Sequence, residues 1–140
     1  MQREYPAQPL VGVGAIIISN GKVVLIKRGK PPLLGEWSIP GGMLELGETL
    51  RAGAEREARE ETGLTVRATE LLGVFERIVP DEAGRTTYHY VLIDFLCEVV
   101  AGEICAGHDA CDARWFTPAE VGAVSLAEDT ADVIRLGFSK

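Results

Sequence analysis

Several features that would point to particular classes of protein are missing from this sequence. It has three cysteines, Cys97, Cys105 and Cys111, and no C-x-x-C pair, so they match neither a disulfide framework nor a zinc site. No apolar run approaches the roughly 18 residues of a membrane span, and the N-terminus lacks the apolar core of a signal peptide. We therefore expect buried or incidental thiols in a cytoplasmic protein.

Positive charge is also scarce. Lysine and arginine number 14 against 21 aspartates and glutamates, which gives a net charge of −7. Nucleic acids and anionic membranes attract basic surfaces, so neither is expected as a partner. If the substrate is itself an anion, something must reverse the local sign of the field, and bound metal ions are the obvious means.

The 140 residues are enough for one domain with a core that needs no disulfide or structural metal. We expect a single domain over residues 1–140, with residues 1–9 as a loose lead-in. Asn20-Gly21 is a strong hairpin signal between two strands rich in β-branched residues. Extended segments are predicted over 11–19, 22–28, 37–40, 64–79 with a bend near Gly73, 88–100 and 114–116.

One long helix is predicted over residues 49–62, because Thr49 is a suitable N-cap and Gly63 stands where a C′ glycine should. Two further helices are expected, a short one from Thr117-Pro118 and a last one over 127–136. Loops are expected over 29–36, 80–87 and 101–112, the last with room for a short strand. Strands and helices do not alternate regularly, so the fold class is α/β (α+β), with a mixed sheet and helices on both faces.

The long helix carries acidic residues on its packing side. At about 100° per residue, Glu57, Glu60 and Glu61 fall on one arc. That arc also holds Leu50, Gly53, Ala54 and Ala58, whereas the opposite side and its edges hold Arg51, Glu55, Arg56, Arg59 and Thr62. A solvated charged face with i,i+4 pairs is the alternative interpretation of this composition. Clustered carboxylates on a packing face are costly without a cation, so the arc favours a phosphate-handling site for Mg²⁺ or Mn²⁺.

The same segment resembles the signature of the Nudix hydrolases, G-x5-E-x7-R-E-U-x-E-E-x-G-U, in which U is aliphatic. All nine fixed positions agree, with Ala58 as a small member of the aliphatic class. We call the signature segment, residues 42–64, the box. The residues GEWSIPG at 35–41 are similar to the segment that precedes the box in this family, and ARWF at 113–116 is similar to the family's final core strand. The matching positions are Gly42, Glu48, Arg56, Glu57, Ala58, Glu60, Glu61, Gly63 and Leu64. The resemblance implies an α/β/α sandwich whose mixed, mainly antiparallel sheet lies between helices.

The resemblance also implies roles for individual residues. Glu57 and Glu61 resemble the principal ligands of Mg²⁺, for which Mn²⁺ is a substitute, and Glu60 resembles a supporting carboxylate or a ligand of a further ion. The carbonyl of Gly41 resembles a backbone ligand, and Gly42 beside it is suited to a close approach of the backbone to a ligand.

Glu48 resembles the outer carboxylate that orients metal-bound water. Arg56 resembles a structural residue that pairs with Glu48 or a neighbouring glutamate.

The general base stays open at this point. Glu57 or Glu60 in the box could serve, and a carboxylate on the loop after the long strand is a rival. Asp109, six residues before Trp115, is our choice there. Glu103 and Asp112 compete with it, and each can equally be a solvated loop residue.

The flanks of the box must decide the substrate. Pro80 lies sixteen residues after Leu64, which is similar to its placement in the ADP-ribose pyrophosphatase group, although a strand-end proline is an equally good explanation. Lys27 and Arg28 could meet phosphate or ribose, or be solvated strand-end charges. Trp37 could stack on a base, but packing is favoured.

The implied activity is hydrolysis of the pyrophosphate bond in a nucleoside diphosphate derivative, with ADP-ribose or a related nucleotide sugar favoured. The alternative is a nucleoside triphosphate pyrophosphohydrolase that removes noncanonical nucleotides such as 8-oxo-dGTP. A non-catalytic Nudix-like binding or regulatory module is a distant third, because such a module is expected to have lost box carboxylates. The partner is then a small nucleotide, and the resemblance is compatible with a homodimer.

Overall fold

The computed structural model describes residues 2–30 and 34–140, so the predicted loop over 29–36 lies partly outside the described residues. Its elements follow the predicted order closely. The strands are β1 (Leu10–Ser19), β2 (Lys22–Arg28), β3 (Trp37–Ser38), β4 (Gly41–Met43), β5 (Thr65–Pro80), β6 (Thr86–Ala101) and β7 (Ala110–Phe116). The helices are α1 (Leu50–Thr62), α2 (Pro118–Ala123) and α3 (Glu128–Phe138). None of the helices in the described residues is long and apolar enough to cross a membrane.

The sheet is mixed and mainly antiparallel, as predicted. Its order is β3-β2-β1-β6-β5, with β4 on β1 and β7 on β2. The parallel pair is β1 with β6, and the other strand pairs are antiparallel. β1 divides its partners: its first half pairs with β4 and its end pairs with β2. The short strand β4 therefore pairs with the first half of β1, beside the part of β1 that β2 does not cover.

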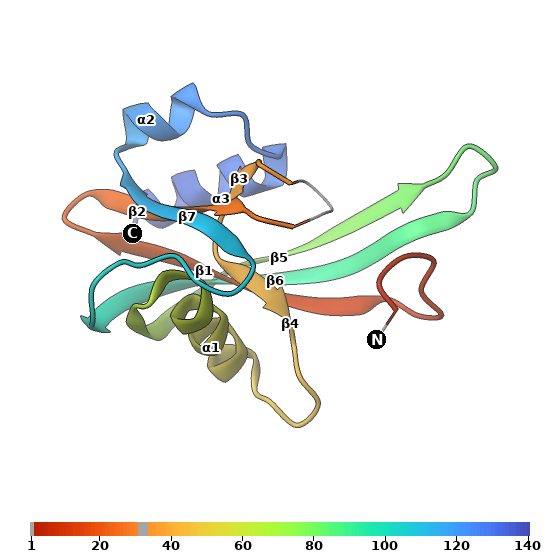
Figure 1. Ribbon diagram of the computed structural model, residues 1–140, viewed down its shortest axis with the longest axis horizontal. Coiled ribbons are helices and arrows are strands. Elements are labelled where there is room, and N and C mark those ends of the chain that lie inside the picture. The colour runs from red at the N-terminus through yellow and green to blue at the C-terminus, as the bar shows by residue number, and fades with distance from the viewer. Residues whose placement is uncertain (1, 31–33) are drawn as a thin grey trace.

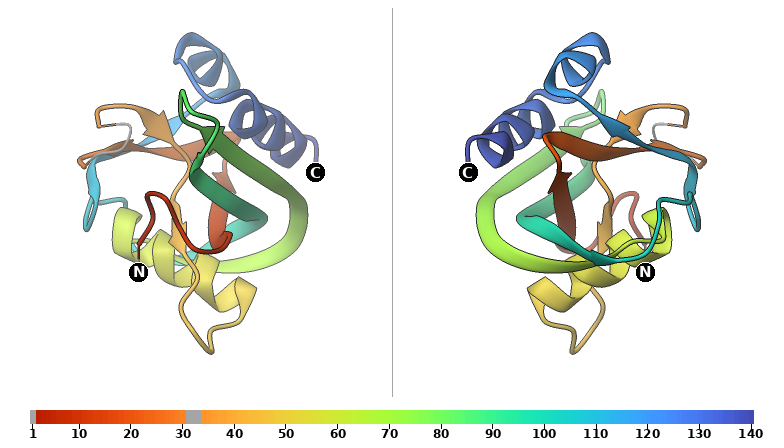
Figure 2. Two further views of the ribbon diagram at one scale, coloured as in Figure 1. Left: turned by 90° about the vertical axis from the view of Figure 1, so that its right-hand side faces the viewer. Right: turned by 90° about the vertical axis from the view of Figure 1, so that its left-hand side faces the viewer.

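The helices lie in two layers on opposite sides of the sheet, as Figures 1 and 2 show. Two apolar clusters fix them there, because successive β1 side chains point to opposite faces. Ala15 and Ile17 pack with Ala54 and Ala58 of α1. Ile16 packs with Val133 and Ile134 of α3 in the other cluster. The α/β/α sandwich is therefore confirmed.

Several boundaries differ from the sequence prediction. β7 begins at Ala110, inside the predicted loop, because its residues pair with β2 up to Arg28. Residues 41–43 form a strand on β1, whereas only an extended approach to the glycines was expected. α3 runs to Phe138, and Pro80 ends β5 where a loop was predicted to start.

The helical wheel was wrong at two positions. Leu50 at the first turn of α1 is 38% exposed, since it lies at the end of the helix beyond the cover of the sheet. Thr62 at the last turn is fully buried, and its hydroxyl donates to the carbonyl of Ala58 at 2.6 Å. The backbone bond satisfies the hydroxyl, which allows a polar residue to occupy the packing face.

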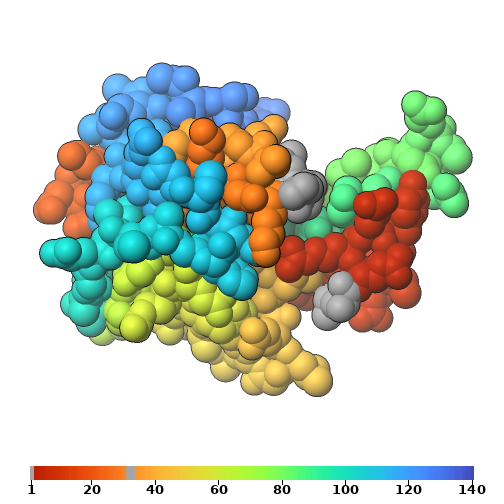
Figure 3. Space-filling view, in the orientation of Figure 1, coloured from red at the N-terminus to blue at the C-terminus, as the bar shows by residue number. Residues whose placement is uncertain are grey.

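Residues 2–9 form no helix or strand, but Tyr5 among them is bound to the β5–β6 hairpin. The Tyr5 amide donates to the carbonyl of Thr87 at 2.8 Å, and its hydroxyl donates to the Asp81 carboxylate at 2.9 Å. The Arg85 guanidinium lies 5.0 Å from the centre of the Tyr5 ring. Figure 3 shows this N-terminal segment alongside the projecting β5–β6 hairpin. These contacts join residues about eighty positions apart, so no local pattern in the sequence indicates them.

Candidate active site

Both ends of helix α1 are capped, and small residues let it pack closely on the sheet. The Thr49 hydroxyl accepts from the amide of Ala52 at 3.1 Å, and Gly63 closes the helix at a φ of 75°. A methyl group at Gly53 would lie 3.1 Å from Val13 and 2.9 Å from a Glu48 oxygen. The glycine therefore lets the helix, the sheet and the preceding loop meet.

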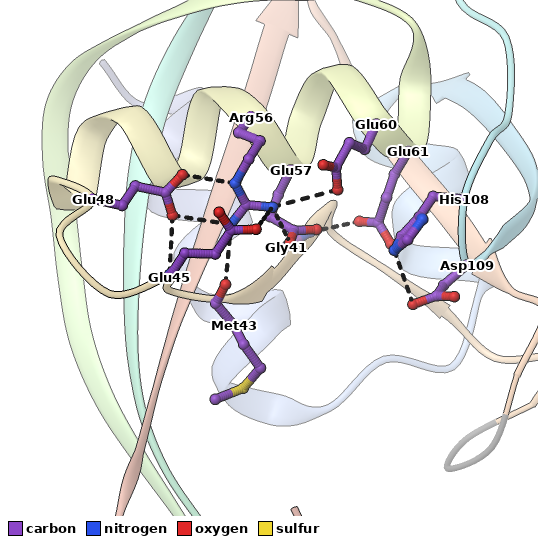
Figure 4. A network of polar contacts seen from close by, with 10 residues as sticks. All are labelled: Gly41, Met43, Glu45, Glu48, Arg56, Glu57, Glu60, Glu61, His108 and Asp109. Atoms are coloured by element: carbon purple, nitrogen blue, oxygen red, sulfur yellow. Dashed lines mark hydrogen bonds and ion pairs between the residues drawn. The ribbon is translucent and has the colours of Figure 1, made fainter. Parts of the chain in front are cut away.

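Arg56 is the centre of the polar network in Figure 4. Its Nε and Nη2 donate to the two oxygens of Glu48 at 2.6 and 3.0 Å, the geometry of a bidentate pair. Nη1 donates to Glu57 at 2.8 Å, and Nη2 also donates to the carbonyl of Met43 at 3.0 Å. These bonds lower the pKa of Glu48 and raise that of Arg56. The expected pairing of Arg56 with Glu48 is thus present and ties the loop to the helix.

Glu57 and Glu61 are the two buried carboxylates of the helix, 8% and 2% exposed. Glu61 accepts from the amide of Gly41 at 2.8 Å. Burial raises the pKa of both groups, for Glu61 to about 7, where the Gly41 bond and the charge of Arg28 partly offset the rise. Both carboxylates therefore resist ionisation in the protein alone.

The glycine pair of β4 is required by these carboxylates. A methyl group at Gly42 would lie 2.6 Å from the carboxyl carbon of Glu57. At Gly41 it would lie 2.6 Å from the carbonyl oxygen of Val13. Contacts under 3.0 Å require something to shift, so the glycines let β4 approach both the helix and β1. The predicted close approach of this backbone to a ligand stays a prediction.

Glu60 and Asp109 lie at the open side of the same cluster. Glu60 is half-buried, with one oxygen 3.4 Å from Arg56 Nη1. Asp109 pairs with Lys30 at 3.0 Å and lies 3.6 Å from His108, and the Lys30 bond lowers the pKa of Asp109. The Asp109 charge in turn raises the pKa of Glu61. Asp109 therefore belongs to the neighbourhood of the box.

The other two loop carboxylates lie differently. Asp112 is bound by Arg114 at 2.7 Å, and Glu103 is exposed and lines a separate depression with Ile104 and Trp115.

The chemistry of the donor set fits a hard divalent cation. Across residues 2–30 and 34–140, no three Asp, Glu, His or Cys side chains converge as a complete cage. Mg²⁺ does not need one, because it is usually held by one or two carboxylates and completes its shell with water and phosphate oxygens. Glu57 and Glu61 supply such a pair, and a cation beside them would remove the cost of ionising both.

A pocket of about 200 Å³ adjoins the box through Gly41 and Gly42. The glutamates themselves do not line it. Arg28 links the two regions, since it lines the pocket and its charge lowers the pKa of Glu61. The remaining lining residues come from β1, β3–β6, α3 and the N-terminal segment: Arg3, Gly12, Val13, Gly14, Ser38, Ile39, Met43, Phe75, Arg77, Tyr90, Leu92, Asp94, Asp129 and Thr130.

Three residues predicted to meet the substrate lie outside this lining. Trp37 packs edge-on against Phe116, with ring centres 5.0 Å apart, in the core on the α3 side. Lys27 lies on β2 between β3 and β7. Pro80 is exposed at the far end of β5, on the projecting hairpin.

The pocket contains functional candidates that the sequence analysis missed. Asp94 is 8% exposed, and Arg77 forms a two-bond ion pair with Asp129 at 2.7 and 2.9 Å. One signal was available: Asp94 interrupts the apolar run VLIDFLC of β6. A second was Gly12 and Gly14 within an otherwise β-branched strand.

The fold and this site together place a pair of buried carboxylates beside a pocket whose lining includes Arg28. The NUDIX domain model matches residues 8–136. The chain therefore belongs to the Nudix family.

Known proteins agree with this assignment. The ADP-ribose pyrophosphatase of Methanocaldococcus jannaschii is 41% identical over 108 residues, 77% of this chain and 62% of that protein. A MutT-like protein of Streptomyces ambofaciens is 34% identical over 122 residues, 85% of this chain and 72% of that protein. The MutT NUDIX hydrolase of Burkholderia pseudomallei superposes with a TM-score of 0.79 at 28% identity, covering 92% of this chain and 98% of that chain.

Proposed function

We propose that this protein is a Mg²⁺-dependent pyrophosphatase that hydrolyses ADP-ribose or a related nucleotide sugar, with Mn²⁺ as a substitute. The observation that supports it most is the buried pair Glu57 and Glu61 behind Gly41 and Gly42, beside a pocket lined by Arg28. The name of the relative at 41% identity supports the substrate. This chain spans 62% of that relative's length, so the substrate is part of the proposal.

Each box residue has a separate task in this proposal. Glu57, Glu61 and the Gly41 carbonyl hold the cation, and Glu60 supports them. The bound cation supplies charge neutralisation at the diphosphate and lowers the pKa of water. Arg56 keeps Glu48 and Glu57 in place through the bonds in Figure 4, and Glu48 orients the attacking water.

Arg28 binds a phosphate oxygen in this proposal, because it lies between the box and the pocket and carries a permanent charge. Glu57, Glu60 and Asp109 are the choices for the general base. Among the loop carboxylates we retain Asp109, since its charge acts on Glu61, and both it and Asp112 are ion-paired, with Lys30 and Arg114 respectively. The Lys30 bond lowers the pKa of Asp109, which keeps it ionised but makes it a weaker base than an unpaired carboxylate.

A panel of substrates with Mg²⁺ tests the proposal. ADP-ribose, other nucleotide sugars and nucleoside triphosphates, including 8-oxo-dGTP, are compared by kcat/KM, and the products are separated by chromatography. We expect AMP and ribose 5-phosphate from ADP-ribose, formed faster than any triphosphate is cleaved. Faster release of pyrophosphate from a triphosphate would instead establish the alternative, a triphosphate pyrophosphohydrolase.

Several broader expectations belong to the same proposal. We infer one domain over residues 1–140, which the family match over 8–136 supports. A cytoplasmic location is supported by free thiols, since Cys97 is buried and Cys105 and Cys111 are exposed and unbridged. The homodimer and the roles of Lys27, Trp37 and Pro80 at the substrate stay predictions.

A further inference from the structure

Asp94 is a buried carboxylate that neither the box nor the core uses. It is 8% exposed, lies in the middle of β6 and lines the pocket. Among the described residues no hydrogen bond or ion pair of its carboxylate is found, and no fully buried side-chain oxygen there lacks a partner, so the Asp94 oxygens open onto the pocket. Its charged neighbours are Asp129 and Arg77, and these two are bound to each other. A carboxylate that faces a pocket and receives no donor from the protein is available to accept a hydrogen bond from a ligand.

The glycines of β1 beneath Asp94 make room for its side chain. A methyl group at Gly14 would lie 2.3 Å from Asp94 Oδ1 and 2.8 Å from Ile39. At Gly12 it would lie 2.9 Å from Leu92. The two glycines share one face of β1, since they are two residues apart, and the side chains of Asp94, Ile39 and Leu92 occupy the space above them. The carboxylate therefore lies over a glycine floor, where a side chain on β1 would exclude it.

The walls of the pocket are apolar and aromatic. Phe75, Tyr90, Leu92 and Ile39 line it together with the buried carboxylate. Ligand sites of this kind take an apolar or aromatic group and orient it with a few polar contacts. A heteroaromatic ring with an N–H donor on its edge satisfies both features of this pocket.

The register places Asp94 at a suitable distance from the box. Asp94 is opposite Gly14 on β1, and Gly14 is opposite Gly41 on β4. Neighbouring strands are about 4.8 Å apart, so the backbones of Asp94 and Gly41 are separated by about 10 Å. A diphosphate held at Gly41 and the glutamates thus leaves about one nucleoside's length to Asp94.

We propose that Asp94 is a specificity-determining residue that accepts hydrogen bonds from the exocyclic amino group of the nucleobase, adenine in ADP-ribose. This inference rests on the proposed function, because it assumes that the diphosphate binds at the box. It assigns the base to the pocket beside Asp94, where Arg77 is bound to Asp129 and the Asp94 carboxylate is left to accept from the base.

The test compares AMP with IMP, in which a keto oxygen replaces the amino group, by calorimetric titration. Asp94→Asn replaces an acceptor oxygen by an amide donor. We expect the wild-type protein to bind AMP more tightly, and Asp94→Asn to lower the ratio of AMP to IMP affinity about tenfold or more. Asp94→Leu, which removes both kinds of contact, should weaken AMP and leave little preference. Asp132→Asn on the exposed side of α3 is the matched control and should keep the wild-type ratio.

Equal weakening of AMP and IMP in Asp94→Asn would overturn the inference and assign the carboxylate to the ribose hydroxyls. An unchanged ratio in a folded variant would overturn it as well. The titration needs no turnover, so its result is separate from the substrate panel. A protein that fails to hydrolyse ADP-ribose but shows the ratio change refutes the proposed substrate and supports the base contact.

Discussion

Two acidic regions of this molecule are built in opposite ways. Around α1, Glu48 and Glu57 share the guanidinium of Arg56, and Glu61 is bound to the Gly41 amide. In the pocket on the other side of β4, Asp94 is nearly as buried but has no such bond among the described residues. The first arrangement fixes geometry, because every carboxylate is held in one orientation. The second leaves bonding capacity for a ligand. The difference suggests that the box performs the chemistry and the pocket selects what is presented to it.

The largest expected effect comes from breaking the box alone. Glu57→Gln and Glu61→Gln each remove a charged ligand while keeping the shape of the side chain. We expect activity to fall by a factor of about 10² to 10⁴ in each, while AMP binding in the pocket is retained. Steady-state kinetics with Mg²⁺ measure the first effect and calorimetry the second.

Glu98→Gln, at an exposed position of β6, is the control for this pair and should be nearly as active as the wild type. Near-normal turnover in Glu57→Gln or Glu61→Gln would remove that residue from the metal site.

A smaller loss of activity is expected when the hydrogen bonds of Arg56 are weakened and the proposed metal ligands are kept. Arg56→Lys keeps the charge but loses the bidentate pair with Glu48. Groups that orient ligands typically contribute 10- to 100-fold, so we expect a loss of about that size in kcat/KM with the fold retained. Arg59→Lys on the outer side of the same helix is the matched control. If Arg56→Lys were as active as that control, the bidentate bond of Arg56 to Glu48 would not position the carboxylates of the site.

The smallest effect is on stability and lies in the pocket. Burial raises the pKa of Asp94 to about 6, from 3.8. Between about pH 4 and 6 the folded protein keeps a proton that the unfolded chain releases, so this group lowers stability as the pH rises through that window. Above it the loss is complete and is on the order of 1–3 kcal/mol.

Asp94→Asn should therefore unfold at higher denaturant concentration than the wild type at pH 8, and the gain should vanish below pH 4. Urea titrations at the two pH values measure it, with Asp132→Asn as the exposed comparison. A variant less stable than the wild type at pH 8 would show that the carboxylate has a structural partner.

The two regions also differ in how far the sequence predicts them. The box lies within one helix and its approach, so the spacing of Glu57, Glu60 and Glu61 shows which side they share, and the caps Thr49 and Gly63 give the bounds of the helix. Local rules sufficed there because neighbours in the sequence are neighbours in space.

The pocket is different, since it combines β1, β5, β6 and α3, whose pairing is decided by tertiary contacts. Arg77 meets Asp129 across 52 positions, and no local pattern predicts that pair. The same limit explains why the sequence predicted an extended segment only from residue 114, whereas β7 begins at Ala110. The first residues of β7 are a strand because they pair with the edge of β2. Trp37 shows it again, because its packing on Phe116 depends on how β2 brings β3 and β7 together.

The account depends most directly on a divalent cation at Glu57 and Glu61, and Mn²⁺ binding without substrate measures this. Free Mn²⁺ is followed by electron paramagnetic resonance during titration of the wild-type protein, Glu61→Gln and Asp94→Asn at pH 8, above the pKa of about 7 of Glu61. We expect Glu61→Gln to bind Mn²⁺ at least about tenfold more weakly, and Asp94→Asn to bind it like the wild type. Equal affinity in wild type and Glu61→Gln, or a loss confined to Asp94→Asn, would contradict the placement of the cation in the box.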